Sequence, residues 1–461
     1  MKKIKIPKAL QEVVAVFLQN SLQVFLVGGA VRDFCLGKMP SDFDIATNAS
    51  PQQVQRLFKR VLATGIKHGT VTVRHRGMSF ECTTFRSEGK YSDARHPDAV
   101  HFVASIEDDL SRRDFTINAM AISLESYKLL DLFGGEHDLK ARLIKTVGSA
   151  TERFAEDPLR MLRAVRFAGT LQFSLEAKTE AAISSLADKI LLVSQERIRE
   201  EFSKMLLAET PIVGLELLER THLLEKIIPE LARGRGIEQG EYHCADVLEH
   251  CFLACNNAPA QLELRLAALF HDIAKPSCKT VDGVGGIHFY GHEVEGEKIT
   301  REVLQRLKYP NKIIDKVCTL VRYHMFNYTS DWKDNTVRKF IAKVGTENID
   351  ELLQLRLADI KGLKKDCGDI SQLLEFQARI EKINADDACF TVQSLKINGN
   401  DLIEIGVPKG KIIGNILNEL LQSVLDDPKE NNRESLLRIA KNLKEKYMIC
   451  ETREARNASN D

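Results

Sequence analysis

The sequence predicts an α+β fold, with a mixed β-sheet in the N-terminal part and helices in the rest of the chain. Short apolar runs separated by turn residues fill residues 1–142, which is typical of strands. From about Ala150 onward apolar residues recur at steps of three and four, which is typical of amphipathic helices. The chain has 461 residues, too many for one core, so several domains are expected.

Breaks in these patterns divide the chain into four predicted parts. A glycine-rich segment, RGRGIEQG, occupies 233–240, and a polar loop, KKDCGDIS, occupies 364–371. Such segments favour domain boundaries. The expected parts are 1–142 with the sheet, followed by three all-helical parts at 143–232, 233–370 and 371–461.

Within the first part, apolar runs and turn residues predict individual elements. The Arg76–Gly77 step suits a hairpin turn, and a proline at the start of a run suits a helix N-terminus. The predicted strands are QVFLVGG (23–29), FDIAT (43–47), VTVRH (71–75) and MSFECTTF (78–85), and the predicted helix is PQQVQRLFKRVL (51–62).

Composition predicts a cytoplasmic protein without a membrane span. Lys+Arg and Asp+Glu both number 65, so the overall charge does not favour nucleic-acid binding, although the arginines are clustered. The ten cysteines include no CxxC pair and are expected to be reduced thiols. No run reaches the roughly 18–20 apolar residues that a span needs, and no feature indicates an oligomeric state.

Three carboxylates form a candidate metal site. Asp42 and Asp44 are two residues apart in SDFDIAT, and alternation along a strand would place both on one face. Glu81 lies in the next predicted hairpin. Clustered carboxylate oxygens suit Mg²⁺, and a pair of magnesium ions could activate a 3′-hydroxyl for attack on a triphosphate. Alone, an Asp-x-Asp motif is more often an exposed loop.

Two nearby segments favour phosphate or ribose binding. GGAVRD (28–33) lies between a strand and a helix start, where glycines and helix N–H groups admit an anion and Arg32 adds a charged donor. An ordinary strand-to-helix turn is the alternative. SRRDFTINAM (111–120) holds Arg112, Arg113, Asp114 and Asn118, which could reach ribose or phosphate, although Asp114 could simply cap a turn.

Four charged residues recur every three positions in EDPLRMLRAVRF and predict one ridge on a helix: Asp157, Arg160, Arg163 and Arg166. A solvated helix face is one interpretation. In the other, the Asp157 carboxylate accepts from an exocyclic amine and Arg160 donates to a ring nitrogen or carbonyl. That pair would select C and A and reject G and U without a template, and the two later arginines would meet phosphates.

In their order along the chain, these segments resemble bacterial class II CCA-adding enzymes, of the poly(A) polymerase and tRNA nucleotidyltransferase group. The matching segments are LVGGAVRDFCLG, DFDIAT, RRDFTINAM, the DLFGG stretch, EDPLRMLRAVRF and SQERIREEF. The resemblance implies a nucleotidyltransferase head, a neck, a body and a tRNA-binding tail in the four parts above. It also implies addition of C, C and A to the 3′ end of tRNA with CTP and ATP.

The resemblance also implies roles for single residues. Asp42 and Asp44 match the Mg²⁺ ligands, and Glu81 stands where the third carboxylate is expected. Asp157 and Arg160 match the base-selecting pair. The remaining nucleotide-binding matches are Gly29, Arg32, Arg113, Arg163 and Arg166.

Residues 85–102 resemble the flexible loop that enzymes adding the terminal A possess and that CC-only enzymes lack. The segment is polar and contains Gly, Ser and Pro, as a mobile loop should. Its candidate residues are Arg86, Glu88, Tyr91, Asp93 and Arg95. Their presence disfavours an enzyme that adds only C.

A histidine-rich block resembles an HD domain, which binds divalent metal for phosphoester hydrolysis. The expected ligands are His250, His271, Asp272 and Asp359, and the same block contains His292 and His324. Imidazole and carboxylate ligands suit Ni²⁺, Co²⁺ or Mn²⁺, and a metal-activated water would be the nucleophile. In the alternative interpretation the block is only a structural body.

Two rival functions remain open. An enzyme that adds only A, to tRNA ending in CC or as a poly(A) polymerase, would share nearly every motif. An HD phosphohydrolase with an RNA-binding head is the second rival, and the intact Asp-x-Asp and arginine ridge argue against it.

Overall fold

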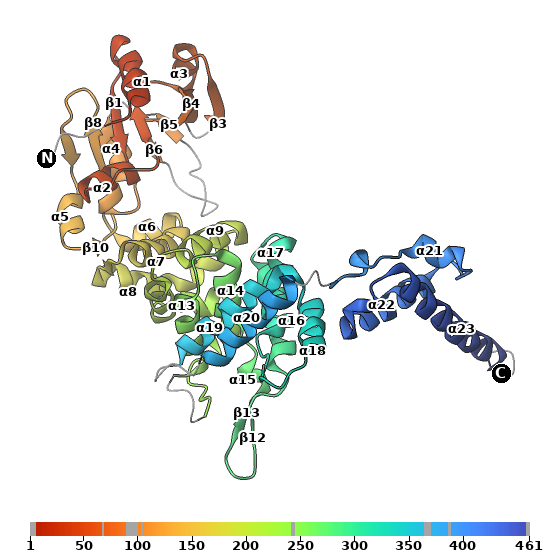
Figure 1. Cartoon of the computed structure of the whole chain (residues 1–461). Helices are drawn as coiled ribbons and strands as arrows, with labels where there is room; N and C mark the ends of the chain where they lie inside the picture. The colour runs from red at the N-terminus through yellow and green to blue at the C-terminus, as the bar shows by residue number, and fades with distance from the viewer. Residues whose placement is uncertain are drawn as a thin grey trace. The chain divides into compact units, whose positions relative to one another are not determined.

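The computed structural model describes residues 6–66, 69–88, 100–102, 105–240, 245–363, 370–385 and 389–457. The chain forms two compact units, Met1–Arg235 with Glu302–Pro310, and Gly236–Arg301 with Asn311–Asp461. A mixed sheet is followed by a mostly helical remainder, which confirms the predicted fold class (Figure 1). The finer division into four parts stays a prediction.

The first unit is built on a seven-stranded sheet with the order β3-β4-β5-β2-β1-β8-β9. Strands β2 and β5 are parallel, and all the other neighbours are antiparallel. The strands are β1 (Val24–Val27), β2 (Asp44–Thr47), β3 (Val61–Gly65), β4 (Thr70–His75), β5 (Met78–Thr84), β8 (Met120–Ser123) and β9 (Leu129–Asp131). A separate pair joins β6 (Arg86–Glu88) to β7 (Val100–Phe102).

Helices pack on both faces of this sheet. On one face Val27 and Ala46 form a core with Ile106 and Leu110 of α4. Helix α1 packs against β1, and its Glu12 accepts from His75 at the end of β4 over 2.6 Å. The helical segments of this region are α1 (Lys8–Gln19), α2 (Gly29–Cys35), α3 (Pro51–Leu57), α4 (Ile106–Ser111), α5 (Gly135–Lys140) and the 3₁₀ turn η2 (Thr116–Asn118).

Strands β4 and β5 form the predicted hairpin. Arg76 and Gly77 both have positive φ, 48° and 79°, and His75 pairs with Met78, the geometry of a two-residue type I′ turn. The helix predicted for residues 51–62 is too long. It ends at Leu57, and β3 begins at Val61, because β4 pairs with this segment along the sheet.

The rest of the first unit is helical, apart from the parallel pair β10 (Leu143–Ile144) and β11 (Ser174–Leu175). Helix α7 packs against α9 and α10. Gly169 of α7 and Gly214 of α10 allow close approach, since a Cβ on Gly169 would lie 3.2 Å from the Gly214 backbone. The helices are α6 (Ala150–Glu156), α7 (Leu159–Leu171), α8 (Ala177–Leu186), α9 (Gln195–Leu206), α10 (Pro211–Arg220), α11 (Leu223–Ile227), α12 (Pro229–Ala232) and the 3₁₀ helix η3 (Ala187–Leu192).

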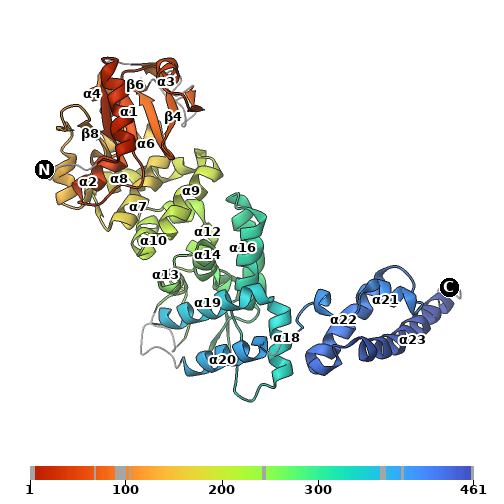
Figure 2. The ribbon, with the colours of Figure 1, turned by 45° about the horizontal axis from the view of Figure 1, so that its top comes forward.

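In the second unit α13 packs against α14 and α19 (Figure 2). One short hairpin, β12 (Thr280–Val281) with β13 (Ile287–His288), interrupts the helices. Among the described residues, no helix combines the length and apolar character that crossing a membrane requires. The helices are α13 (Val247–Asn257), α14 (Leu262–Phe270), α15 (Lys275–Cys278), α16 (His292–Arg306), α17 (Asn311–Tyr323), α18 (Asp334–Val344), α19 (Ile349–Gly362), α20 (Ser371–Ala385), α21 (Gly399–Glu404), α22 (Lys411–Asp426) and α23 (Arg433–Asn457).

Candidate functional site

Two carboxylates lie side by side in the centre of the sheet. Asp44 begins β2 and is directly opposite Glu81 of β5 in the parallel register, so their side chains share one face. Asp42 lies in the loop before β2, contrary to the expected strand position, and is exposed. The strand begins only at Asp44, where pairing with Val27 starts.

The Asp44 carboxyl is in an environment that disfavours its ionised form. Burial and the negative charge of Glu81 raise the pKa of Asp44 to about 6, and Arg113 offsets only part of this effect. Two adjacent carboxylates with incomplete compensation fit a divalent cation, since oxygen ligands are what Mg²⁺ prefers.

The glycine turn between β1 and α2 brings an arginine close to Asp44. Gly28 has φ of 68°, and a Cβ there would lie 3.3 Å from Arg113 Nη1 and 3.6 Å from Asp44 Oδ2. A larger residue would strain the turn and crowd both side chains. Gly29 begins α2, where a Cβ would approach Arg32 Nη2 at 3.4 Å.

The arginine pair after α4 is held by a residue that the sequence analysis did not single out. Asp109 is fully buried and accepts from Arg112 at 2.7 Å and from Arg113 at 3.0 Å. Acidic residues three and four positions before arginines on a helix are a usable sequence signal. It was available in the segment DDLSRR.

Asp114 is the centre of a network that joins the sheet region to α7. Its Oδ1 accepts from the Phe115 N–H at 2.9 Å and from Asn118 at 3.3 Å, and its Oδ2 accepts from Arg163 at 2.7 Å. Asn118 Oδ1 in turn accepts from Arg32 at 3.1 Å. Burial would raise the pKa of Asp114, but Arg163 holds it below its usual value.

Asp157 and Arg160 do not pair with one another. Asp157 precedes α7 and accepts from Arg197 Nη2 at 2.7 Å. Arg160 is buried, donates to Glu156 at 2.5 Å, and also donates to the Arg112 carbonyl at 3.3 Å. Within the predicted base-selecting pair, Asp157 is therefore held in place by Arg197 and Arg160 by Glu156. Neither partner was predicted from the sequence.

A cavity of about 300 Å³ brings most of these groups together. It is lined by Arg112, Arg113, Asp114, Asp157, Leu159, Arg160, Arg163 and Arg197. Its charged lining and the single apolar Leu159 suit a polar, anionic ligand with one flat face.

The later arginines of the ridge are not a solvated face. Arg163 and Arg166 are partly buried and share Glu201 of α9, which is itself buried. The Arg166 guanidinium lies 3.9 Å from the centroid of the Phe167 ring. Among these side chains only Arg163 lines the cavity, and Arg166 is turned toward Glu201 and Phe167.

The predicted flexible loop is described only at its ends. Arg86 and Glu88 lie in β6, which pairs with β7. Tyr91, Asp93 and Arg95 lie outside the described residues.

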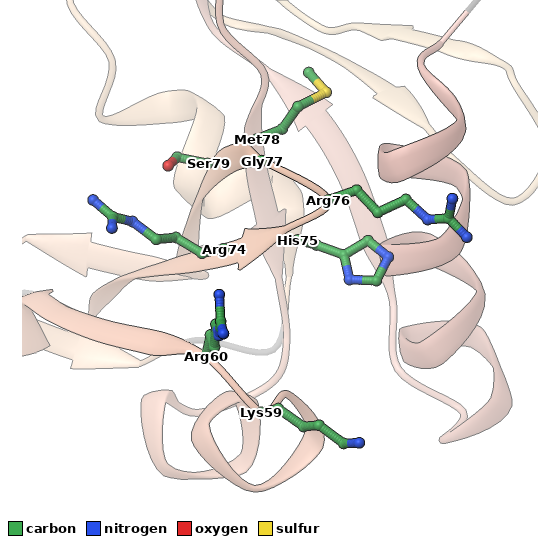
Figure 3. A pocket seen from close by; sticks show the side chains of 8 residues that line it. All are labelled: Lys59, Arg60, Arg74, His75, Arg76, Gly77, Met78 and Ser79. Atoms are coloured by element: carbon green, nitrogen blue, oxygen red, sulfur yellow. The ribbon is translucent and has the colours of Figure 1, made fainter.

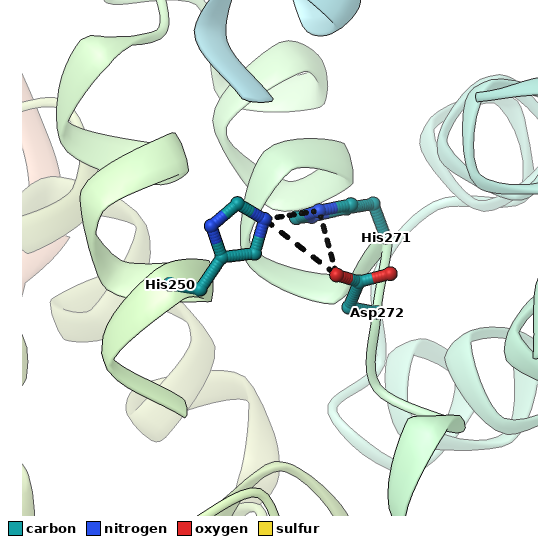
Figure 4. Close-up of side chains that lie close together, drawn as sticks. All are labelled: His250, His271 and Asp272. Carbon is teal, nitrogen blue, oxygen red and sulfur yellow. Dashed lines mark hydrogen bonds and ion pairs between the residues drawn. The ribbon is translucent and has the colours of Figure 1, made fainter. Parts of the chain in front are cut away.

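In the second unit, the predicted HD ligands converge from different helices. His250 Nε2 lies 3.2 Å from His271 Nε2 and 3.6 Å from Asp272 Oδ2 (Figure 4). Asp359 of α19 lies 3.0 Å from His250 Nε2. The ring nitrogen Nδ1 of His271 bonds the Ala268 carbonyl at 2.8 Å, which directs Nε2 toward the cluster.

Two histidines outside the predicted ligand set extend this cluster. His292 Nε2 and His324 Nε2 lie 3.3 Å and 3.6 Å from Asp272 Oδ1, and both rings are buried. Asp272 thus belongs to two groups of three potential ligands, one with His250 and His271 and one with His292 and His324. Burial opposes protonation, yet Asp272 and Asp359 raise the pKa of His271 to about 10, so the cluster favours a cation.

Three family models match successive parts of the chain. A poly A polymerase head domain matches residues 24–145. A probable RNA and SrmB-binding site of polymerase A matches residues 172–234, and a putative tRNA nucleotidyltransferase domain 2 matches residues 292–440.

CCA-adding enzymes of several bacteria match the chain, some over almost its whole length and some over about half of it. The CCA-adding enzyme of Pediococcus pentosaceus is 34% identical over 415 residues, which cover 90% of this chain and 92% of that protein. The Lactobacillus johnsonii CCA-adding enzyme is 48% identical over 205 residues, covering 44% of this chain and 51% of that protein. The crystal structure of the Bacillus stearothermophilus CCA-adding enzyme in complex with CTP superposes with a TM-score of 0.73 at 29% identity, covering 98% and 100% of the two chains.

Proposed function

The chain belongs to the CCA-adding enzymes, and from that premise we propose that Asp42, Asp44 and Glu81 are its catalytic carboxylates. The enzyme adds C, C and A to the 3′ end of tRNA with CTP and ATP. One observation carries the assignment of the site: Asp44 and Glu81 stand opposite each other on one sheet face, with Arg113 and the charged cavity beside them.

Asp42, Asp44 and Glu81 would hold Mg²⁺. When bound, the metal supplies charge stabilisation for phosphoryl transfer and favours deprotonation of the RNA 3′-hydroxyl. Arg113, held by Asp109 at 3.0 Å, brings its guanidinium close to Gly28 and Asp44. There it is suited to an oxygen of the triphosphate.

Base selection falls to Asp157 and Arg160 at the cavity. The Asp157 carboxylate would accept from the amino group of cytosine or adenine, and the Arg160 guanidinium would donate to the neighbouring ring acceptor. Arg197 and Glu156 restrict the two side chains, which reduces the entropy lost on binding. Uracil and guanine present a carbonyl oxygen in place of the amine, and the Asp157 carboxylate has no proton to donate to it. Arg32, Asn118, Asp114 and Arg163 would hold the cavity wall, and the tail, 371–461, would bind tRNA.

Incubating the enzyme with a tRNA transcript that lacks CCA, and with CTP alone, tests this function. We expect incorporation of two C residues, and one further A once ATP is added. Relatives matched over nine-tenths of the chain are CCA-adding enzymes, which favours this outcome over A-only addition. Failure to incorporate C while A is added to a tRNA ending in CC would establish the A-adding alternative.

We also propose that the second unit binds divalent metal, Ni²⁺, Co²⁺ or Mn²⁺, and hydrolyses phosphoesters. The specific observation is that Asp272 is shared by two groups of three buried ligands. His250 and His271 with Asp272, and His292 and His324 with Asp272, would hold the metal, which would supply Lewis-acid activation of water and of the phosphoester. Lys275 Nζ, 2.6 Å from Asp272 Oδ2, supplies a positive charge there in the metal-free protein.

Replacing Asp272 by asparagine should remove two equivalents of bound Co²⁺, because Asp272 belongs to both groups of potential ligands. His324→Ala should remove only one, since His324 belongs to a single group. Metal content after dialysis, measured by mass spectrometry, and hydrolysis of bis(p-nitrophenyl) phosphate give the two readouts. Equal cobalt content in wild type and Asp272→Asn would show that the cluster is structural.

A further inference from the structure

A second basic surface lies on the β3–β4–β5 side of the catalytic carboxylates. It lines a cavity of about 740 Å³ formed by the β4–β5 hairpin and the start of β3. None of the residues that line it is acidic: Lys59, Arg60, Arg74, His75, Arg76, Gly77, Met78 and Ser79.

The strand register places Arg60 and Arg74 on the same sheet face as the carboxylates. Glu81 is opposite Thr72, and Arg74 is opposite Ser79, so Arg74 is a diagonal neighbour of Glu81. Such neighbours lie about 7–8 Å apart. The backbone N–H of Arg74 donates to the Arg60 carbonyl at 2.9 Å. Arg60 therefore lies next to Arg74, at the edge of the sheet where β3 begins.

The opposite side of the same hairpin is engaged with α1. Arg76 and His75 both bond Glu12, at 2.6 Å each. Figure 3 shows Arg74 and Ser79 pointing away from His75 and Arg76. Of the basic side chains that line the cavity, His75 and Arg76 are thus paired with Glu12, whereas Arg60 and Arg74 face solvent.

Arg60 and Arg74 are exposed, and neither forms an ion pair with an acidic residue in the part of the chain that the structure describes. Two exposed arginines on segments joined by a backbone hydrogen bond concentrate positive charge and attract an anion with repeated charges. A backbone of successive phosphodiesters has that property.

The order of the strands separates this surface from the nucleotide cavity. From β2 and β5, the β1–α2 turn with Arg113 lies in one direction across the sheet, and β4 and β3 with Arg74 and Arg60 lie in the other. Nucleotidyl transfer brings a triphosphate and an RNA 3′ end to the same carboxylates from different sides. The triphosphate would bind beside the β1–α2 turn and Arg113. The RNA would then reach the carboxylates from the side of β4 and β3.

We propose that Arg60 and Arg74 bind backbone phosphates of the RNA strand that leads to the reacting 3′ end. The inference rests on the proposed function of the carboxylate site. The two arginines would position the RNA strand through its phosphates. Phosphate contacts of this kind do not distinguish one base from another.

The full-length Arg60→Ala/Arg74→Ala variant tests the proposal through its binding to a tRNA transcript that lacks CCA. Fluorescence anisotropy between about 50 and 200 mM salt gives the dissociation constant and its salt dependence. We expect affinity at low salt to fall at least tenfold, and the slope of log K against log salt to decrease by about 1.4, or 0.7 for each lost phosphate contact.

Two controls accompany this variant. Arg56→Ala removes one positive charge, where the double variant removes two, from an exposed position on α3 outside the cavity and should leave the slope unchanged. Arg60→Lys/Arg74→Lys keeps both charges and should keep most of the slope. Circular dichroism checks that each variant is folded.

Unchanged tRNA affinity and slope in the folded alanine variant would overturn the proposal. So would weakened binding of CTP with intact tRNA binding, since that places the nucleotide on this surface. If the wild-type protein binds tRNA with the expected slope but adds no C, the proposed function fails separately from this inference.

Discussion

Replacing Asp44 by asparagine should abolish nucleotide incorporation. The amide keeps the shape of the side chain but removes the charge that a divalent cation needs, beside Glu81. Loss of metal-assisted stabilisation of the transition state costs several kcal/mol, so we expect a decrease in kcat/KM of roughly 10³-fold or more. Incorporation of labelled CTP into tRNA measures the loss.

The same substitution should stabilise the metal-free protein at alkaline pH. Burial and Glu81 raise the pKa of Asp44 from 3.8 to about 6. The stability that its protonated form confers is complete below about pH 4 and is lost as the pH rises through 6. Asparagine remains neutral, so at pH 8 its free energy of unfolding should exceed that of wild type by about 1–3 kcal/mol.

Urea unfolding at pH 5 and pH 8 distinguishes this effect from a general change in packing. The advantage of Asp44→Asn should grow with pH and shrink when Mg²⁺ is added, because the metal binds and stabilises only the wild type. Asp42→Asn is the matched control: Asp42 is exposed, so activity should fall without the gain in stability. A variant that unfolds more easily than wild type at pH 8 would contradict the prediction.

Replacing Asp157 by asparagine should relax the choice of base. The amide presents N–H donors where the carboxylate only accepts, so the carbonyl oxygen of uracil gains a partner and the cytosine amine loses one. A site that hydrogen-bonds its substrate rejects an analogue by large factors, and we expect the CTP/UTP ratio of kcat/KM to fall by roughly 10²-fold or more. Single-nucleotide addition to tRNA lacking CCA measures both values.

Arg197→Gln is the control for this substitution. It removes the partner that holds Asp157 at 2.7 Å but leaves the carboxylate in place. We therefore expect weaker CTP binding with a smaller change in the CTP/UTP ratio than in Asp157→Asn. An unchanged ratio in Asp157→Asn would remove this residue from base selection.

Local sequence patterns were sufficient for much of the sheet. Alternation and the Arg76–Gly77 turn predicted β4 and β5 within one residue at each end. The error at residues 58–62 arose because a run of mixed apolar and basic residues suits a helix as well as an edge strand. Pairing of Val61 with Val73 decides between them, and a partner strand is not visible in local periodicity.

Unusual residue types and spacings made three groups recognisable in the sequence. They are the carboxylates, the arginine ridge and the four predicted ligands of the histidine-rich block. The acidic partners of the arginines were not recognisable, except for Asp109 and Glu156, which precede their arginines by three or four positions. Arg163 meets Asp114 and Arg197 meets Asp157 across 49 and 40 residues of chain. The first pair depends on how α7 packs against the segment between α4 and η2, and the second on how α7 packs against α9.

By itself the sequence determined the order of sheet and helices, the hairpin, and the chemical groups available for metal and nucleotide binding. Periodicity and residue type express these properties within a few turns of chain. Only the tertiary structure decided that Glu81 stands opposite Asp44, that Asp272 is shared by two histidine pairs, and that Arg60 and Arg74 extend the face of the carboxylates. These juxtapositions come from strand register and helix packing, which join residues too distant in the chain for any local pattern to relate them.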